Sequence, residues 1–277
     1  MRKAILRLAV VAVALGLGAC AAVPKGAGTG ERMGERNGAN AAAKGARYTY
    51  VLVHGAWAGG FEWKKVGDQL LADGHYVERV TLTGMGERSH LSNPDIDLNT
   101  HITDVVNTIL FENLHDVVLM GHSYGGMVIT GVADRVPDRI KCVVYVDAFL
   151  PVDGESLNSI APSGGPSLAV VNGFVGSAPR PGAQPPYNVP QPAKTLSQPV
   201  SLKNQDKVAK IPTVYILTVD RGGRPENDSF YKSYQRAQGR GWFTEIMEGP
   251  HTVNISAPLE TARRLEAAPE QALATTK

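Results

Sequence analysis

The chain has 277 residues, of which 43% are hydrophobic and 19% are charged, and its formal net charge is +2. A chain of this length can bury one large hydrophobic core and is short for two, so we expect one main folded domain. Acidic and basic residues are scattered along the chain, and no basic block is dense enough to follow a phosphate backbone. The charge distribution therefore argues against nucleic acid as a partner.

The first twenty residues have the composition of an export signal. Basic residues come first, and the apolar run 5–17 that follows is shorter than the roughly 20 residues of a membrane-spanning helix. The sequence Leu-Gly-Ala-Cys at 17–20 resembles the bacterial lipobox, in which the cysteine carries a lipid. We therefore expect residues 1–20 to be a signal peptide, Cys20 to be lipidated, and the protein to be exported as a membrane-anchored bacterial lipoprotein, facing the periplasm or the cell surface. An ordinary signal peptide, giving a periplasmic or secreted protein, is the alternative.

Residues 21–46 are rich in glycine and alanine and lack apolar periodicity, which predicts a flexible linker before a domain at 47–277. The second of the two cysteines, Cys142, lies in the apolar run 140–146, where a cysteine behaves as a small buried hydrophobe. No disulfide bond is therefore expected.

From residue 48 onwards, apolar runs typical of strands alternate with segments of helical periodicity. We expect strands at 48–53, 76–82, 117–120, 140–146, 213–219 and 243–247, and helices at 61–72, 100–111, 124–135 and from about 256. This alternation predicts an α/β fold with a mostly parallel central sheet covered by helices on both faces. At about 150–212 proline and glycine recur, which predicts an insertion that forms a short, loop-rich cap.

The run Gly121-His122-Ser123-Tyr124-Gly125 directly follows the predicted strand 117–120 and directly precedes a predicted helix. In that context, a G-x-S-x-G sequence is typical of a nucleophile elbow, whose tight turn requires glycine on both sides of a strained serine. The sequence therefore predicts Ser123 as a catalytic nucleophile.

A serine hydroxyl needs an imidazole to accept its proton, and an acid to orient that imidazole. Folds with this elbow supply the residues in the order Ser, acid, His, and among seven histidines only His251 follows Ser123. For the acid we favour Asp220, which ends the strand 213–219. Asp147 is the rival, because it also ends a strand, although that strand directly precedes the cap, and Asp228 is a third candidate.

The oxyanion formed during attack needs backbone N–H donors, for which the elbow predicts Tyr124 and the turn after the first strand predicts Ala56. Four large apolar residues follow strand ends and are candidates for the substrate pocket, although core packing explains each of them equally well: Trp57, Met85, Phe149 and Leu150. No spacing of histidine, cysteine and carboxylate suggests a metal site, and the chemistry requires no cofactor.

Several runs together resemble the plant methylesterase and hydroxynitrile lyase family and its bacterial carboxylesterase relatives. They are His-Gly-Ala-Trp-Ala-Gly-Gly-Phe-Glu-Trp at 54–63, the elbow at 121–127, Thr-Val-Asp at 218–220 and Gly-Pro-His at 249–251. The resemblance covers about 48–265 and implies the α/β-hydrolase fold with a triad of Ser123, Asp220 and His251. The lyases carry a threonine in place of Gly55 and a lysine where this chain has Thr252, so the resemblance argues against cyanohydrin cleavage.

The sequence as a whole predicts a serine carboxylesterase that hydrolyses small to medium apolar esters through an acyl-enzyme. The expected partner is a small-molecule ester, with membrane contact only through the lipid anchor, and no oligomeric state is predicted. The alternatives are an acyltransferase or a hydroxynitrile-lyase-like enzyme with the same triad, and a lipid-anchored protein that binds a ligand without turnover.

Overall fold

The computed structural model describes residues 47–161, 169–176 and 179–275, which all belong to one compact unit, Ala43–Lys277. The predicted signal peptide, Cys20 and the whole of the predicted linker lie outside the described residues. In the described ranges, no helix combines the length and the apolar character needed to cross a membrane.

A six-stranded parallel sheet forms the centre of the described domain, in the order β2-β1-β3-β4-β8-β9. Its strands are β1 (Thr49–Val53), β2 (Tyr76–Val80), β3 (Val117–Ser123), β4 (Ile140–Ala148), β8 (Thr213–Val219) and β9 (Phe243–Glu248). The middle strands β3, β4 and β8 are almost wholly buried, because parallel strands covered on both faces expose neither side to water. The predicted fold class is thereby confirmed.

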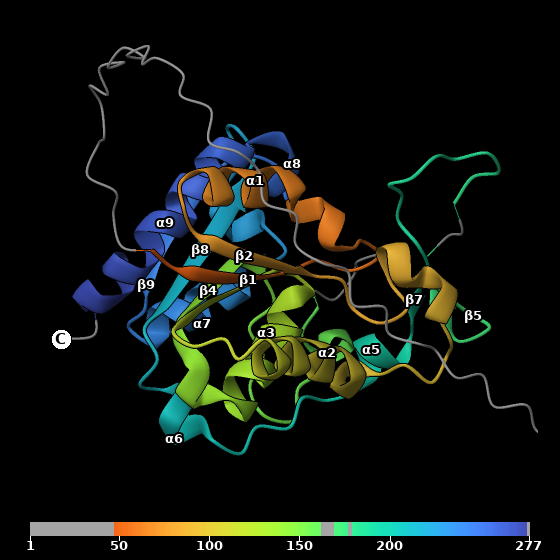
Figure 1. Cartoon of the computed structure of the whole chain (residues 1–277), viewed down its shortest axis with the longest axis horizontal. Helices are drawn as coiled ribbons and strands as arrows, with labels where there is room; N and C mark the ends of the chain where they lie inside the picture. The colour runs from red at the N-terminus through yellow and green to blue at the C-terminus, as the bar shows by residue number, and fades with distance from the viewer. Residues whose placement is uncertain (1–46, 162–168, 177–178, 276–277) are drawn as a thin grey trace, which may run out of the picture. The chain divides into compact units, whose positions relative to one another are not determined.

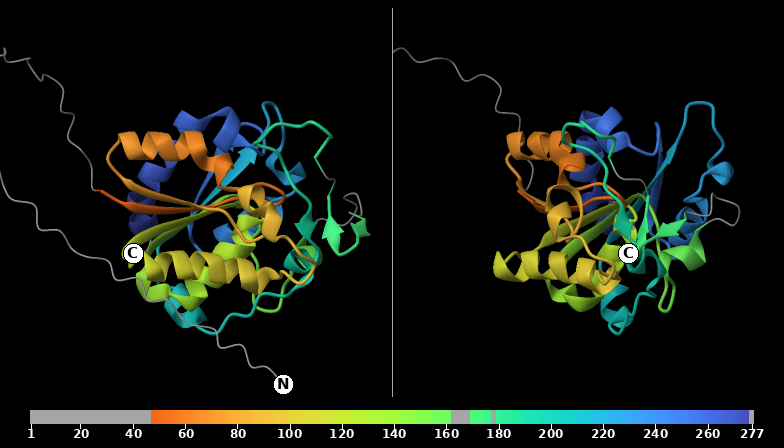
Figure 2. Two further views of the ribbon diagram at one scale, coloured as in Figure 1. Left: turned by 45° about the vertical axis from the view of Figure 1, so that its right-hand side comes forward. Right: turned by 90° about the vertical axis from the view of Figure 1, so that its right-hand side faces the viewer.

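Helices cover both faces of this sheet (Figures 1 and 2). One face packs against α1 (Lys64–Ala72), α8 (Val253–Ser256) and α9 (Pro258–Thr275), and the other against α2 (Leu98–Phe111), α3 (Gly125–Arg135) and α7 (Tyr231–Gly239). The helix α2 begins with a capping box, in which Asp97 accepts from the N–H of Thr100 and the Thr100 hydroxyl lies 3.5 Å from the Asp97 N–H. The two helical layers enclose two separate hydrophobic cores.

Between β4 and β8 the described regular structure is sparse. It consists of the single-turn helices α4 (Leu157–Ile160), α5 (Lys194–Ser197) and α6 (Gln205–Val208) and of a small antiparallel sheet of β5 (Val170–Val171), β6 (Phe174–Val175) and β7 (Gln191–Pro192). Short 3₁₀ turns elsewhere span Gly60–Trp63, Gly86–Leu91, Pro137–Arg139 and Pro225–Asn227. The recurring prolines and glycines explain why no long element forms in this insertion.

Candidate active site

Ser123 stands at the end of β3, in the sharp turn before α3. Its φ of 55° lies in the left-handed region, where a non-glycine residue is strained by about 1–3 kcal/mol. The flanking glycines permit this turn, because a Cβ on Gly121 would lie 2.7 Å from the Gly125 carbonyl oxygen and a Cβ on Gly125 would lie 2.8 Å from that of Val53. The elbow geometry that the motif predicts is therefore present at Ser123.

The imidazole of His251 is held by Asp147. The Nδ1 of His251 lies 2.6 Å from Oδ2 of Asp147, and the other carboxylate oxygen accepts the backbone N–H of Thr218 at 2.9 Å. The Asp147 side chain is fully buried, with 0% of the residue exposed, so both of its oxygens depend on these donors. A carboxylate can only accept from Nδ1–H, and this tautomer leaves Nε2 free to accept a proton.

The prediction that Asp220 orients His251 is therefore wrong, and the rival Asp147 occupies that position. Asp220 is exposed and lies in a turn in which its carbonyl oxygen accepts from the N–H of Gly223 at 2.7 Å. The reason lies in a bulge of β4: His122 pairs with Val146, but the next residue, Ser123, pairs with Ala148. Asp147 is the extra residue.

The bulge redirects the side chain of Asp147. Its φ of 45° is left-handed, a conformation that aspartate tolerates better than most residues. The buried hydroxyl of Tyr215 donates to the carbonyl oxygen of Ala148 at 2.6 Å and so supports the bulge from β8. The third candidate, Asp228, is partly exposed, and its side chain accepts a hydrogen bond from the N–H of Phe230 at 2.7 Å. The pKa of Asp228 is raised, mainly by burial and secondly by the negative charge of Asp147.

His251 remains accessible while it is held from two sides. Its side chain is 41% exposed, and its ring stacks on Phe230 with the centroids 4.9 Å apart and an interplanar angle of 7°. The Nε2 of His122 donates to the backbone oxygen of His251 at 2.8 Å. Within the described residues the Ser123 hydroxyl makes no hydrogen bond, and such contacts commonly close only when substrate is bound.

The turn after β1 leaves one backbone amide free. The N–H of Gly55 donates to Glu62 at 3.1 Å, and the N–H of Trp57 donates to the side chain of Gln191 at 2.9 Å. Between them, the N–H of Ala56 has no acceptor in the described parts of the chain, and neither has the N–H of Tyr124. Unpaired amides at these two positions are what an oxyanion hole requires.

The four predicted pocket residues divide into two pairs. Met85 and Leu150 are fully buried in the hydrophobic core, where packing accounts for both. Trp57 and Phe149 are only partly buried: the indole N–H of Trp57 donates to the carbonyl oxygen of Val175 at 3.1 Å, and Phe149 packs on Phe230 with centroids 4.7 Å apart. Only the second pair has surface that a ligand could contact.

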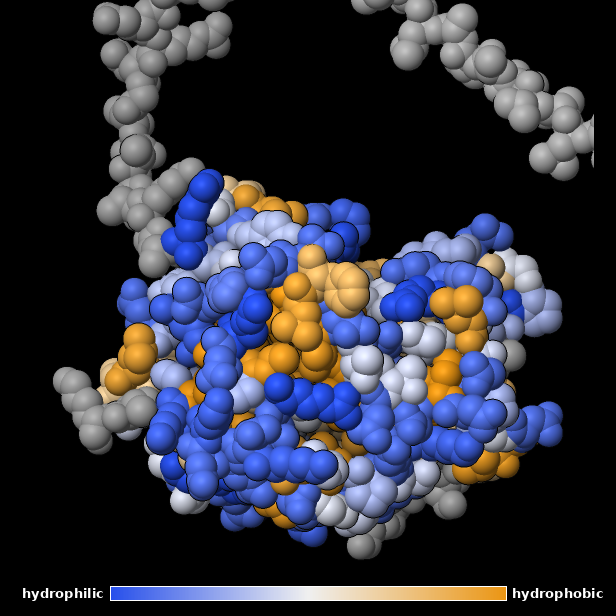
Figure 3. Space-filling view, turned by 60° about the horizontal axis from the view of Figure 1, so that its bottom comes forward, coloured by the Kyte–Doolittle hydropathy of each residue, from blue (hydrophilic) through white to orange (hydrophobic). Residues whose placement is uncertain are grey.

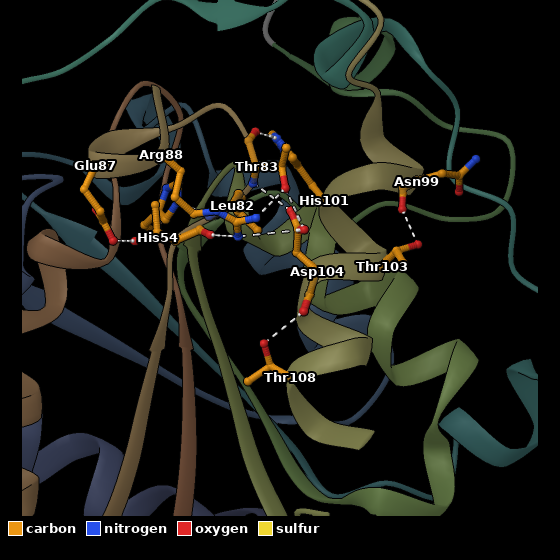
Figure 4. Close-up of polar contacts among 11 residues, drawn as sticks. His54, Leu82, Thr83, Glu87, Arg88, Asn99, His101, Thr103, Asp104 and Thr108 are labelled. Atoms are coloured by element: carbon orange, nitrogen blue, oxygen red, sulfur yellow. Dashed lines mark hydrogen bonds and ion pairs between the residues drawn. The ribbon is translucent and has the colours of Figure 1, made fainter. Parts of the chain in front are cut away.

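A polar network that the sequence did not predict links α2 to the elbow. Figure 4 shows the part of it around His101, Thr83 and Asp104. His101 accepts from the hydroxyl of Tyr124 at 2.9 Å and donates from Nε2 to the carbonyl oxygen of Thr83 at 3.0 Å, and burial lowers its pKa to about 3. Asp104, one turn further along α2, accepts from both the N–H and the hydroxyl of Thr83, at 2.7 and 2.8 Å. The network ties α2 to the residue after Ser123, and only the position of His101 on the apolar face of its helix could have indicated its burial.

A cavity of about 420 Å³ lies apart from these residues, between α3, β4, β8 and α6, and its walls include Tyr145, Arg240 and Trp242. Figure 3 shows a cluster of apolar residues surrounded by hydrophilic ones on the side of the molecule that lies at the bottom in Figure 1. Neither Ser123 nor His251 lines the cavity.

In the described ranges, no three histidine, cysteine or acidic side chains are grouped so that they could hold a metal ion.

Comparison with known proteins identifies similar sequences. A family model described as "Alpha/beta hydrolase family" matches residues 50–264. A carbendazim-hydrolysing esterase of Nocardioides sp. is 48% identical over 132 residues, which are 47% of this chain and 54% of that protein. Methylesterase 2 of Arabidopsis thaliana is 36% identical over 104 residues, 37% of this chain and 40% of that protein. The chain thus spans about half or less of the length of these relatives.

Solved structures resemble the domain over most of its length. An extracellular α/β-hydrolase from a Paenibacillus species, described as sharing structural and functional homology with tobacco salicylic acid binding protein 2, has 28% identity and a TM-score of 0.65. The match covers 79% of this chain and 98% of that one. A methylesterase from Arabidopsis matches 80% of this chain and 99% of its own, with a TM-score of 0.63, but at 22% identity that likeness concerns the fold alone.

Proposed function

Because the chain belongs to the alpha/beta hydrolase family, we propose that it is a serine carboxylesterase, with Ser123 as nucleophile, His251 as general base and Asp147 as the orienting acid. The observation that carries this proposal is the 2.6 Å hydrogen bond between His251 and a fully buried Asp147, at the sheet edge where Ser123 stands in a strained turn. Relatives described as esterases support the reaction type.

In the proposed mechanism, Nε2 of His251 accepts the hydroxyl proton of Ser123 as its oxygen attacks the ester carbonyl. The N–H groups of Ala56 and Tyr124 stabilise the oxyanion, a contribution of about 10²–10³-fold per donor in enzymes of this kind. Asp147 stabilises the imidazolium that forms. The alcohol then leaves with the proton from His251, and a water molecule activated by the same imidazole releases the acid from the acyl-enzyme.

The substrate class we propose is a small to medium apolar or aromatic ester. Two aromatic rings near the site are partly exposed. Trp57 directly follows Ala56, and Phe149 packs on Phe230, whose own buried ring stacks on His251. Relatives named methylesterase and carbendazim-hydrolysing esterase make a small alcohol, such as methanol, a reasonable leaving group.

The position of Gly55 favours hydrolysis over the lyase alternative. A Cβ there would lie 3.1 Å from Cβ of Ser123 and 3.2 Å from Nδ1 of His122, so the threonine typical of the lyases would crowd the nucleophile. Transfer to an added alcohol or thiol, or cleavage of a cyanohydrin, would instead identify one of the alternative activities.

The test is hydrolysis of p-nitrophenyl esters from acetyl to long acyl chains and of methyl esters of aromatic acids. Wild type is compared with Ser123→Ala and with Ser201→Ala, a matched change at an exposed serine outside the site. We expect activity to be lost only in Ser123→Ala and to be greatest for short or aromatic acids. Equal inactivity of wild type and Ser123→Ala on every ester would contradict the proposed substrate class and would favour an enzyme of narrow substrate range or the binding-protein alternative.

We also propose that the protein is exported and anchored through a lipid on Cys20, on the strength of its N-terminal sequence alone. Mass spectrometry of the N-terminal peptide from the native host tests this. An unmodified N-terminus that begins at another residue would support secretion without an anchor.

A further inference from the structure

A buried carboxylate lies behind the proposed catalytic residues. Glu62, in the 3₁₀ turn before α1, is only 8% exposed, and its Oε2 accepts the N–H of Gly55 at 3.1 Å. Its Oε1 lies 3.7 Å from Nδ1 of His122, which is the one ion-pair contact of Glu62 in the described residues. A buried carboxylate is costly unless a cation faces it. The side chain that can supply this charge is the imidazole of His122.

The hydrogen bonds indicate where the protons lie on the two buried imidazoles. The Nε2 of His122 contacts the carbonyl oxygen of His251, which can only accept, so this nitrogen carries a proton. Its Nδ1 is buried without a hydrogen-bond partner and faces the carboxylate of Glu62. His54, by contrast, donates from Nδ1 to Gly55 and accepts the N–H of Leu82 at Nε2, as a neutral ring does.

The electrostatics agree with a charged pair. Burial lowers the pKa of His122, but the negative charge of the facing Glu62 carboxylate outweighs it and raises this pKa above its ordinary value. Burial likewise raises the pKa of Glu62, but the charge of His122 and the N–H of Gly55 reduce it to about 2. For His54, burial dominates and lowers the pKa, which leaves His122 as the cation.

The pair connects three segments that carry the proposed chemistry. Glu62 holds Gly55, the neighbour of the free Ala56 amide, and His122 directly precedes Ser123. His122 also donates to the backbone of His251, and the two rings lie 4.4 Å apart. A second link comes from α8, where the side chain of Asn254 donates to the carbonyl oxygen of Glu62 at 3.2 Å.

We propose that the Glu62–His122 ion pair is a positioning element, which sets the spacing of the nucleophile, the general base and the oxyanion-binding turn without contacting substrate. This inference rests on the proposed function. Because neither side chain contacts the ester, loss of the pair should reduce kcat and leave KM nearly unchanged. A small displacement of reacting groups can cost on the order of 10²-fold in rate.

The experiment compares wild type with Glu62→Gln, His122→Gln and the double variant, in the full chain. Glu245→Gln is the control. Glu245 is a partly buried acid that forms an ion pair with Arg264 at 2.7 Å, and this pair joins β9 to α9, away from Ser123. We measure kcat and KM on the best ester of the series, the rate at which a fluorophosphonate labels Ser123, and the melting temperature. All rates are normalised to the folded fraction.

We expect each single variant to lower kcat and the labelling rate by about 10–100-fold, with KM within about twofold and the control unchanged. The double variant should be no slower than the slower single variant, because the two residues act as one unit. Folded single variants with wild-type kcat, or effects that simply add, would overturn the proposal.

A measurement on wild type needs no variant to fold. In a pH series of nitrogen-15 spectra, His122 should keep protons on both ring nitrogens at pH values above the ordinary imidazole pKa of about 6.5. A His122 ring that is already neutral at and above that pH overturns the ion pair even if every variant unfolds. Failure of wild type to hydrolyse any ester or to be labelled at Ser123 would refute the proposed function separately, because the spectrum reports on the pair alone.

Discussion

Replacing Asp147 with asparagine tests the corrected acid most directly. The variant keeps the volume of the side chain, and its oxygen can still accept from the N–H of Thr218. The amide nitrogen that then faces His251 is a donor, so Nδ1 must become the acceptor and the ring proton moves to Nε2. That tautomer cannot accept the proton of Ser123.

The expected loss is about 10⁴-fold in kcat, which corresponds to about 5.4 kcal/mol of activation free energy. The assay is p-nitrophenyl acetate hydrolysis, followed from the first turnover so that acylation and deacylation are measured separately. Asp220→Asn is the matched control, and its exposed position predicts a kcat within about twofold of wild type. A large loss in Asp220→Asn together with an active Asp147→Asn would refute the reasoning and restore Asp220 as the acid.

Three further predictions concern stability. Gly126→Ala should lower the melting temperature, because the added Cβ would collide with the carbonyl oxygen of Phe149, and differential scanning calorimetry measures the shift. Tyr215→Phe should cost about 1–3 kcal/mol in urea unfolding, because it leaves the buried carbonyl of Ala148 without that donor. The pKa of Glu62 is reduced from 4.5 to about 2, so its ionised form stabilises the fold above pH 4.5, and this stabilisation is lost as the pH falls from 4.5 towards 2. Urea midpoints across that range should fall less steeply in Glu62→Gln, and identical slopes would contradict this.

Local sequence signals were sufficient to predict the sheet and the strained turn at Ser123. The six central strands are short apolar runs bounded by turn residues, and each predicted run coincides with an observed strand. The elbow depends on two glycines and a serine within five residues, so its geometry is encoded where it is used. His251 followed from the order of the chain alone.

Features that depend on tertiary contact were not predictable in the same way. The helix α7 (Tyr231–Gly239) was not predicted, since its buried residues are only Ser233, Tyr234 and Ala237, too few for a recognisable apolar stripe. Glu62 lies in the run 54–63, but its partner His122 is distant in sequence. The residues next to Glu62 in the sequence do not indicate that its side chain will be buried against an imidazole.

The choice between Asp147 and Asp220 shows why strand ends alone do not identify a catalytic acid. Asp147 is the last residue but one of β4, Asp220 directly follows the neighbouring parallel strand β8, and in chain order both lie between Ser123 and His251. The strand order places β4 directly beside β3, so an acid on β4 is one strand closer to the nucleophile than an acid on β8. The remaining difference is the bulge, because without the extra residue the side chain at 147 would follow the regular alternation of β4. A single unpaired residue, stabilised by the Tyr215 hydroxyl from the next strand, thus determines which carboxylate contacts His251.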